Sequence, residues 1–238
     1  MRAEEQKKAT LTSGNALDAG LVSGGQQGVH PRLEEIVRRH LDSRWLQPLH
    51  RPSVESYQRL IGETLLAAGQ PFILDSGCGT GKSTLQLASR YSGHLVIGVD
   101  RSKVRLSKSG VDQSLYQSGN CILLRADLPT VWRLLVKDGY MPDKHFLFYP
   151  NPWPKSHHLK RRWHGHPVFP DLLALGGEIE MRCNWETYAR EFAQAVTYAT
   201  GEAVAVNRHR PRAGVSPFEQ KYMQRSHRLF VVTVPRQD

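Results

Sequence analysis

Three aspartates stand at the ends of three short apolar segments, in positions that suit a cationic ligand. Asp75 follows the first segment, Asp100 ends the second, and Asp127 comes shortly after the third. The segments cover residues 72–74, 95–99 and 121–124. Each has the length and apolar character of a buried strand. Because the carboxyl ends of parallel strands share one edge of a sheet, where ligands bind, the sequence predicts an acidic site at that edge.

A glycine-rich turn, residues 75–81, joins the first segment to a helix expected over 81–91. Gly77, Gly79 and Gly81 allow a tight turn and let a ligand approach the backbone. One interpretation is a nucleotide-phosphate loop, because residues 81–84 match the end of a Walker A motif. That motif needs a glycine at position 76, which is serine here. The other interpretation is S-adenosylmethionine, whose ammonium and sulfonium suit Asp75 better than a triphosphate would.

The two later aspartates favour S-adenosylmethionine over ATP. Asp100 could accept hydrogen bonds from ribose hydroxyls, as does the acid about twenty residues beyond the glycine turn in adenosine-binding folds. Asp127 could receive the adenine amino group. Both aspartates could alternatively cap the helices that follow them.

A second candidate site follows the fourth predicted strand, residues 145–149. Three prolines within five residues hold Asn151 and Trp153 on a stiff loop. The basic run after it contains Lys155, His157, Lys160, Arg161 and Arg162. We expect this run to bind phosphates, with a solvated surface as the alternative. Trp153 could stack on a flipped base or pack against the prolines.

The rest of the chain alternates short apolar segments with helices, which predicts right-handed βαβ units and a mainly parallel sheet. Further strands are expected over 178–183, 202–206 and 229–234, and helices over 33–41, 54–65, 129–137, 168–175 and 185–199. We divide the chain into a disordered polar tail over 1–28, N-terminal helices over 29–70 that pack on the domain, and an α/β domain over 71–238.

The composition points to a polyanionic partner. Lys and Arg number 32 against 22 Asp and Glu, which gives a formal net charge of +10 and a pI of about 9.7. Such a balance favours nucleic acid. The three cysteines are far apart and lack CxxC spacing, so neither a disulfide framework nor a metal site is predicted. No segment predicts a membrane span or a signal peptide, and we expect a cytoplasmic protein.

The two candidate sites together resemble the tRNA (guanine-N7)-methyltransferase family over residues 72–234. The most specific match is Tyr-Pro-Asn-Pro-Trp-Pro-Lys at 149–155 with its basic run. The other matches are the glycine-rich turn with Asp100, the segment 176–188, and Ser-Pro-Phe-Glu at 216–219. The resemblance implies a Rossmann-like class I methyltransferase fold. This is an α/β fold with a mostly parallel seven-stranded sheet, helices on both faces and the last strand antiparallel.

The resemblance also implies roles for individual residues. Asn151 is the catalytic position that faces the reacting base. The cofactor, S-adenosyl-L-methionine, would contact Asp75, Gly77, Gly79, Gly81, Asp100, Arg101, Asp127 and Leu128. The substrate side would comprise Trp153, Lys155, His157, Lys160, Arg161, Arg162, Asn184, Ser216, Phe218 and Glu219. The implied partner is tRNA or another structured RNA, with the protein a monomer or homodimer.

Two departures from the family concern acids. The family usually has Asp at positions 151 and 184, where this chain has Asn. Guanine N7 carries no proton, so methyl transfer to it needs alignment more than a base. A carboxylate would stabilise the positive charge that develops on the purine better than an amide. We therefore predict a tRNA guanine-N7 methyltransferase with slowed or redirected chemistry. The alternatives are a methyltransferase of another RNA nucleobase and a non-catalytic RNA-binding protein. Asn184 could also cap the following helix.

Overall fold

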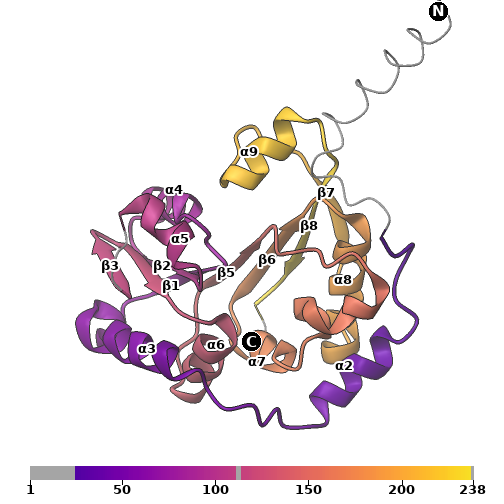
Figure 1. The fold of residues 1–238 in the computed structure, drawn as a ribbon, viewed down its shortest axis with the longest axis horizontal. Coiled ribbons are helices and arrows are strands. Elements are labelled where there is room, and N and C mark those ends of the chain that lie inside the picture. Colours follow the sequence, from indigo (N-terminus) through magenta and orange to yellow (C-terminus); the bar gives the residue numbers. More distant parts are fainter. Residues whose placement is uncertain (1–24, 111–113, 237–238) are drawn as a thin grey trace, which may run out of the picture.

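A twisted eight-stranded sheet forms the centre of the molecule (Figure 1). The computed structural model describes residues 25–110 and 114–236. The strand order is β3-β4-β2-β1-β5-β6-β8-β7. The strands are β1 (Phe72–Ser76), β2 (Leu95–Asp100), β3 (Leu115–Ser118), β4 (Cys121–Arg125), β5 (Lys144–Phe148), β6 (Glu178–Cys183), β7 (Val206–His209) and β8 (Leu229–Val234). Strands β4, β2, β1, β5 and β6 pair in parallel, whereas β8 is antiparallel to both β6 and β7.

The predicted α/β sheet is confirmed, but two of its details were wrong. The sheet has eight strands rather than seven, because β3 adds an antiparallel strand beside β4. Only Leu115 of β3 is buried, so the segment lacks the apolar pattern that reveals a strand. Strand β7 covers Val206–His209 instead of 202–206, because its pairing with β8 decides the register of this half-exposed edge strand.

Helices cover both faces of the sheet because its central strands are apolar on both sides. Every residue of β1 and β2 is buried. The helices are α2 (Leu33–Leu41), α3 (Arg51–Glu63), α4 (Lys82–Arg90), α5 (Lys103–Leu106), α6 (Leu128–Lys137), α7 (Phe169–Ala174), α8 (Glu186–Thr200) and α9 (Pro217–Gln224). Four 3-10 turns cover Leu65–Ala68, Ser107–Ser109, Ser156–Arg161 and Trp163–Gly165. Side chains of α2, α3, α6, α7 and α8 join one core cluster, and those of α4 and α5 join the other.

The described chain begins with a segment that is bonded to the proline-rich loop after β5, residues 149–155, which we call the proline loop. The Gln26 backbone N–H donates to the Pro154 carbonyl at 2.9 Å, and the Gln26 side chain donates to Glu191 at 2.6 Å. Residues 25–28, which the sequence assigned to the tail, therefore contact the folded domain, and the rest of the predicted tail, residues 1–24, lies outside the described part. Among the described helices, none combines the length and the apolar character needed to cross a membrane.

Candidate active site

The turn after β1 depends on its glycines. Gly77, Gly79 and Gly81 have φ angles of +80°, +62° and +78°, in the left-handed region that favours glycine. A Cβ on Gly81 would lie 2.7 Å from a methyl of Leu123, so this residue packs directly against β4. A Cβ on Gly77 or Gly79 would meet nothing within 4 Å. The turn therefore presents open backbone at Gly77 and Gly79 and closes tightly at Gly81.

Asp75 lies beneath this turn and is fully buried. Its Oδ2 accepts hydrogen bonds from the Ser83 hydroxyl at 2.6 Å and the Thr84 hydroxyl at 2.7 Å, while its Oδ1 has no partner among the described residues. Burial raises the pKa of Asp75 to about 6, although the two hydroxyls oppose this shift. The carboxylate fixes the first turn of α4 and does not line the pocket described next, which corrects its assignment as a direct cofactor contact.

A pocket of about 350 Å³ lies at the carboxyl ends of β1, β2, β4 and β5. Seven residues predicted from the sequence line it: Gly77, Asp100, Arg101, Asp127, Leu128, Asn151 and Phe218. Seven that were not predicted also line it: Ser76, Arg105, Pro129, Phe148, Tyr149, Pro150 and Trp163. Most of the second set adjoin a predicted residue in the chain, and that adjacency was the signal available in the sequence.

Asp100 connects the glycine-rich turn to the pocket. Its Oδ2 accepts from the Gly79 backbone N–H at 3.0 Å and its Oδ1 from the Ser102 N–H at 2.8 Å. Arg105 lies 3.3 Å from the same carboxylate. A carboxylate oxygen has two lone pairs, so Oδ2, which has the Gly79 N–H as its one partner among the described residues, retains capacity to accept a further hydrogen bond. Asp100 is thus preorganised by backbone amides and can still receive hydroxyls of a ribose.

Asp127 both caps α6 and faces the pocket. Its Oδ2 accepts from the Thr130 backbone N–H at 3.2 Å and from the Thr130 hydroxyl at 3.0 Å. Its own N–H donates to Ser53 of α3 at 2.8 Å. The two interpretations of this aspartate are therefore compatible, since one carboxylate can cap a helix and border the pocket.

The residues of the pocket fit S-adenosylmethionine. Open space adjoins the Gly77 backbone, which suits close approach of a ligand. Asp100 offers hydrogen-bond acceptors on one side, and Leu128 and Phe148 offer apolar surface. Such a mixture of apolar walls with a few fixed polar groups is typical of a nucleoside site.

The loop after β5 brings Asn151 to the same pocket through strained backbone. Tyr149 and Trp153 have φ angles of +53° and +45°, which is uncommon for residues other than glycine. Asn151 is exposed, and its Oδ1 accepts a long hydrogen bond of 3.4 Å from the Trp153 N–H. Trp153 does not line the pocket; the Arg161 guanidinium lies 4.8 Å from the centre of its ring. The ring of His158 lies 5.5 Å from that of Trp153, so Trp153 contacts the basic run in this structure, and its stacking on a base stays a prediction.

Arg162 is a correction to the predicted phosphate-binding run, because its side chain is fully buried. Its guanidinium donates to the Trp153 carbonyl at 3.0 and 3.2 Å and to the Lys155 carbonyl at 3.2 Å. It also forms an ion pair with the buried Glu191. Arg162 therefore holds the loop in shape and cannot contact RNA from this position.

Glu191 of α8 collects the contacts behind the loop. It accepts from the Gln26 side chain at 2.6 Å, the His30 N–H at 2.9 Å and His164 at 2.9 Å, besides Arg162. Burial alone would raise the pKa of Glu191, but His164 and Arg162 outweigh it and lower that pKa to about 2. The carboxylate stays charged and joins the N-terminal segment, α8 and the proline loop.

Glu219 and Ser216 are two further corrections, because both are buried rather than open to RNA. The Glu219 carboxylate accepts from the Tyr149 hydroxyl at 2.8 Å, His209 at 2.9 Å and the Val215 N–H at 2.6 Å, and it pairs with Arg182. Ser216 caps α9 by accepting from the Glu219 N–H at 3.2 Å. These residues position the segment around Phe218, whose side chain is 47% exposed at the pocket.

The other predicted substrate residues remain at the surface or at its edge. Lys155, His157, Lys160 and Arg161 are exposed. Asn184 is half-buried, and its amide lies 3.3 Å from the ring of His227. It does not cap α8, whose N-terminal flanking residue is Trp185.

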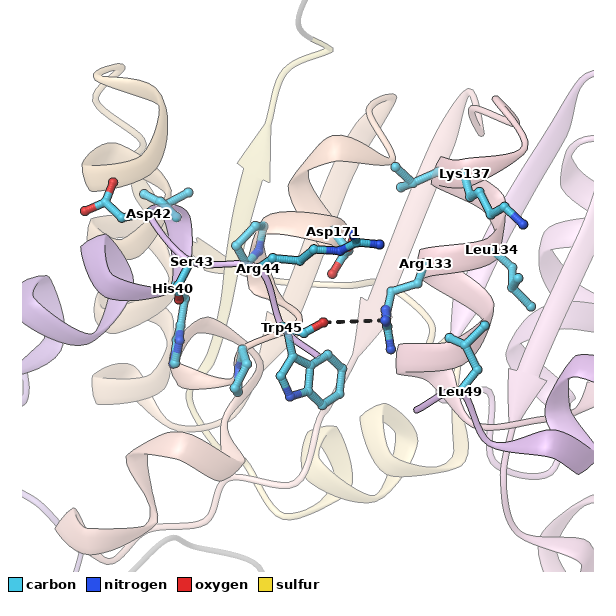
Figure 2. Close-up of a pocket in the computed structure, with 14 residues that line it drawn as sticks. His40, Asp42, Ser43, Arg44, Trp45, Leu49, Arg133, Leu134, Lys137 and Asp171 are labelled. Carbon is cyan, nitrogen blue, oxygen red and sulfur yellow. Dashed lines mark hydrogen bonds between the residues drawn. The ribbon is translucent and has the colours of Figure 1, made fainter. Parts of the chain in front are cut away.

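A second hollow, of about 680 Å³, lies between the segment 40–49 and helices α6 and α7 (Figure 2). Figure 2 shows Arg133 beside Trp45, and the guanidinium lies 5.2 Å from the centre of that ring. Arg133 also donates to the Gln47 carbonyl at 2.7 Å. The hollow contains no residue of the glycine-rich turn or the proline loop, so it is separate from the candidate active site.

The sheet order and the pocket at its carboxyl edge define a class I methyltransferase fold. A solved 16S rRNA methyltransferase, KamB, has a similar fold with a TM-score of 0.50 and 15% sequence identity, and the alignment covers 82% of this chain and 97% of that one. The family model described as "Putative methyltransferase" matches residues 69–230.

Similar sequences narrow the class to one family. The tRNA (guanine-N(7)-)-methyltransferase of Aeromonas hydrophila is 30% identical over 167 residues, covering 67% of this chain and 68% of that protein. The enzyme of the same name from Ectopseudomonas mendocina is 28% identical over 216 residues, covering 87% and 89%. The chain therefore belongs to the tRNA (guanine-N7)-methyltransferase family. The predicted fold class, family, enzyme class and S-adenosylmethionine cosubstrate are confirmed.

Proposed function

We propose that this protein transfers a methyl group from S-adenosylmethionine to N7 of a guanine in tRNA. The observation that carries the proposal is the position of Asn151, which lines the same pocket as Gly77, Asp100 and Asp127. The reaction is the one in the names of the related enzymes. The proposal is supported because residues predicted to bind the methyl donor line the same pocket as the residue predicted to face the base. A cytoplasmic location fits this substrate, and the oligomeric state stays a prediction.

The pocket is suited to alignment more than to proton transfer. Bound S-adenosylmethionine supplies an electrophilic methyl group on a sulfonium. Asp100 and Gly77 would hold the nucleoside part of the donor, and Phe218 and Trp163 offer aromatic surface against which a guanine could lie. Because guanine N7 has an exposed lone pair, these residues need only hold it in line with the methyl group.

Asn151 is the residue placed to respond to the charge that develops on the purine. Its one hydrogen bond within the described part of the chain is the long contact of 3.4 Å from the Trp153 N–H, so its carbonyl oxygen can turn toward a base. A neutral amide stabilises positive charge less than the carboxylate usual in the family. Asn151→Asp should therefore raise kcat with little change in KM, and Asn151→Ala should lower kcat.

The proposal that the substrate is RNA is supported by three exposed cations, Lys155, Lys160 and Arg161. They follow Asn151 on the same loop and extend its edge with positive charge. Arg161 is held by the Trp153 ring, so part of the ordering cost of this cation is met before RNA arrives. These cations would hold phosphates next to the base that enters the pocket.

The test is methylation of tRNA by the purified protein, read by mass spectrometry of the nucleosides and by chemical cleavage at N7-methylguanine. We expect N7-methylguanine that disappears when S-adenosylmethionine is omitted. Calorimetric titration with S-adenosylmethionine is the control. Donor binding without any methylated nucleoside would overturn the proposal and favour a non-catalytic RNA-binding protein.

A second candidate is methylation of an exocyclic base amine, which the amide at Asn151 favours because its oxygen can accept an amine hydrogen. The same nucleoside analysis distinguishes the two functions. A methylated adenine or cytosine as the main product would support this alternative, and N7-methylguanine as the only product would exclude it.

A further inference from the structure

The segment from Arg208 to Arg228 carries a concentration of positive charge that the active site does not use. We call it the C-terminal arm; it contains the end of β7, a connecting loop, α9 and the turn before β8. Five of its cations are exposed: Arg208, Arg210, Arg212, Lys221 and Arg228. Its one carboxylate, Glu219, is fully buried. The charge on the outer surface of the arm is therefore all positive.

The five exposed cations of the arm have no ion-pair partner within the described chain, since the ion pairs of Glu219 go to Arg182 and His209. By contrast, Arg51 and Arg59 of α3 pair with Glu55 and Glu63, and Arg236 pairs with Asp143. Arg208 lies over the ring of Phe230 at 5.0 Å, which leaves its charge unneutralised. Unpaired cations of this density repel one another, and a polyanion that covers them removes that repulsion.

The arm is fixed relative to the active site by the buried carboxylate of Glu219. Through this carboxylate, His209 of β7 and the Val215 N–H are joined to the Tyr149 hydroxyl of the proline loop. Phe218, on the first turn of α9, lines the active-site pocket. In Figure 1, α9 and β7 lie together at one end of the molecule, away from α3. A ligand on the arm would thus be held in register with the pocket.

Aromatic rings accompany the cations. Phe218 and Tyr222 are stacked with ring centres 6.2 Å apart, and Tyr222 stacks on His227 at 5.1 Å. Cations interleaved with aromatic rings are typical of surfaces that bind nucleic acid strands, because phosphates need charge and bases need a flat apolar face. The core of an interface with a folded protein is depleted of charge, whereas five of the exposed side chains of the arm are cations and none is a carboxylate.

We propose that the C-terminal arm binds backbone phosphates of the RNA whose base enters the pocket, and so sets the register of the substrate. This inference rests on the proposed function, since it takes tRNA as the substrate. The arm and the basic run of the proline loop would then grip the RNA on two sides of Asn151. The occupant is recognised by charge and shape, without reading of base sequence.

The experiment is tRNA binding at a series of salt concentrations, with the triple variant Arg210→Gln, Arg212→Gln, Lys221→Gln. These side chains are exposed, and none makes a hydrogen bond or ion pair with a described residue, so the fold should persist. We expect about tenfold weaker binding and a salt dependence whose slope falls by about two to three, because each lost phosphate contact removes somewhat less than one counterion. The affinity for S-adenosylmethionine should stay unchanged, which checks that the fold is intact.

The matched control is the triple variant Arg51→Gln, Arg59→Gln, Arg236→Gln, which removes the same charge from paired, remote positions. We expect less than about a twofold change in tRNA affinity, because these cations are locally neutralised. An equal loss in both variants would show that net charge alone matters, and an unchanged salt slope in the arm variant would show that the arm does not touch RNA. Either result would overturn the proposal.

Binding and methylation together separate this proposal from the proposed function. Arm-dependent tRNA binding without methyl transfer would overturn the function and leave the arm as an RNA-binding surface. Normal methylation with wild-type affinity and salt slope in the arm variant would overturn the arm alone. Absence of any tRNA binding by the unmodified protein would overturn the arm proposal and leave another class of partner for this surface.

Discussion

The chain enters left-handed backbone after β1 and again after β5, but with opposite kinds of residue. After β1 the positive φ angles fall on Gly77, Gly79 and Gly81, where they cost little. After β5 they fall on Tyr149 and Trp153, where each costs on the order of 1–3 kcal/mol. Both loops border one pocket, so the same edge of the sheet is built by two different strategies.

The difference lies in what holds each loop. Glycines make the first turn by local conformational freedom. The second loop is held from behind, because Glu219 accepts from the Tyr149 hydroxyl and Arg162 donates to the Trp153 carbonyl. Strained backbone persists only when surrounding contacts compensate for it. Buried ions therefore stabilise the backbone of the proline loop, whereas glycines allow that of the glycine-rich turn. Changes to the two loops should have separable effects.

The largest expected effect follows from Arg162→Met. The substitution leaves Glu191 buried without its guanidinium and frees the Trp153 and Lys155 carbonyls, which should lower the free energy of unfolding by about 3–5 kcal/mol. The neighbouring Arg161→Met is the control, because it loses only a stacking contact worth about 1 kcal/mol. Urea unfolding measures both; similar losses for the two variants would contradict a supporting role for Arg162.

The second prediction concerns how stability near the glycine-rich turn depends on pH. The pKa of Asp75, raised by burial from 3.8 to about 6, makes its stabilising contribution fully present below pH 3.8 and lost as pH rises through 6. At about 1.4 kcal/mol per pKa unit, that loss amounts to about 3 kcal/mol. Asp75→Asn removes the titration, so the free energy of unfolding of the variant should gain on the wild type between pH 4 and pH 7.

Glu191 behind the proline loop should show the opposite pH dependence. Its pKa, lowered from 4.5 to about 2, gives stability that is present above pH 4.5 and lost as pH falls toward 2. Denaturation at several pH values, with and without Asp75→Asn, measures the contrast. A constant difference in the free energy of unfolding between wild type and Asp75→Asn from pH 4 to pH 7 would refute the raised pKa of Asp75.

The third prediction compares two glycines of the glycine-rich turn. Gly81→Ala adds a Cβ within 2.7 Å of Leu123 to a residue at φ +78°, so conformational cost and overpacking should together lower stability by about 2–4 kcal/mol. Gly79→Ala meets no atom within 4 Å and should cost about 1–2 kcal/mol from conformation alone. Thermal unfolding of both variants checks the order, and a larger loss at Gly79 would contradict it.

The smallest expected effect tests the strain at Trp153. With φ at +45°, glycine should be more stable than alanine at this position by about 1 kcal/mol. Lys155, with φ at −73°, is the matched site, where alanine should be better than glycine by about 0.5–1 kcal/mol. Chemical denaturation of the four variants measures this reversal. The same preference at both sites would mean that backbone strain does not distinguish the loop.

Much of the candidate active site was predictable because its signals are local. Asp100, Asp127 and the glycines stand at strand ends, and an apolar run followed by such residues needs no tertiary information to be recognised. Strand β3 escaped prediction for the converse reason, since its residues are mostly exposed and it exists only by pairing with β4. Trp163 lines the pocket from a 3-10 turn that no periodic pattern announces.

The sequence by itself determined the aspartates and glycines at the strand ends, the family motifs and the excess of positive charge. Only the tertiary structure decided which charges are available. Arg162 and Arg161 are neighbours, yet one is buried against Glu191 and the other is exposed on Trp153. Glu219 likewise turned out to be an internal anchor of the C-terminal arm. Burial depends on segments far apart in the chain, and the cost of desolvating a charge makes its function depend on the partners those segments bring.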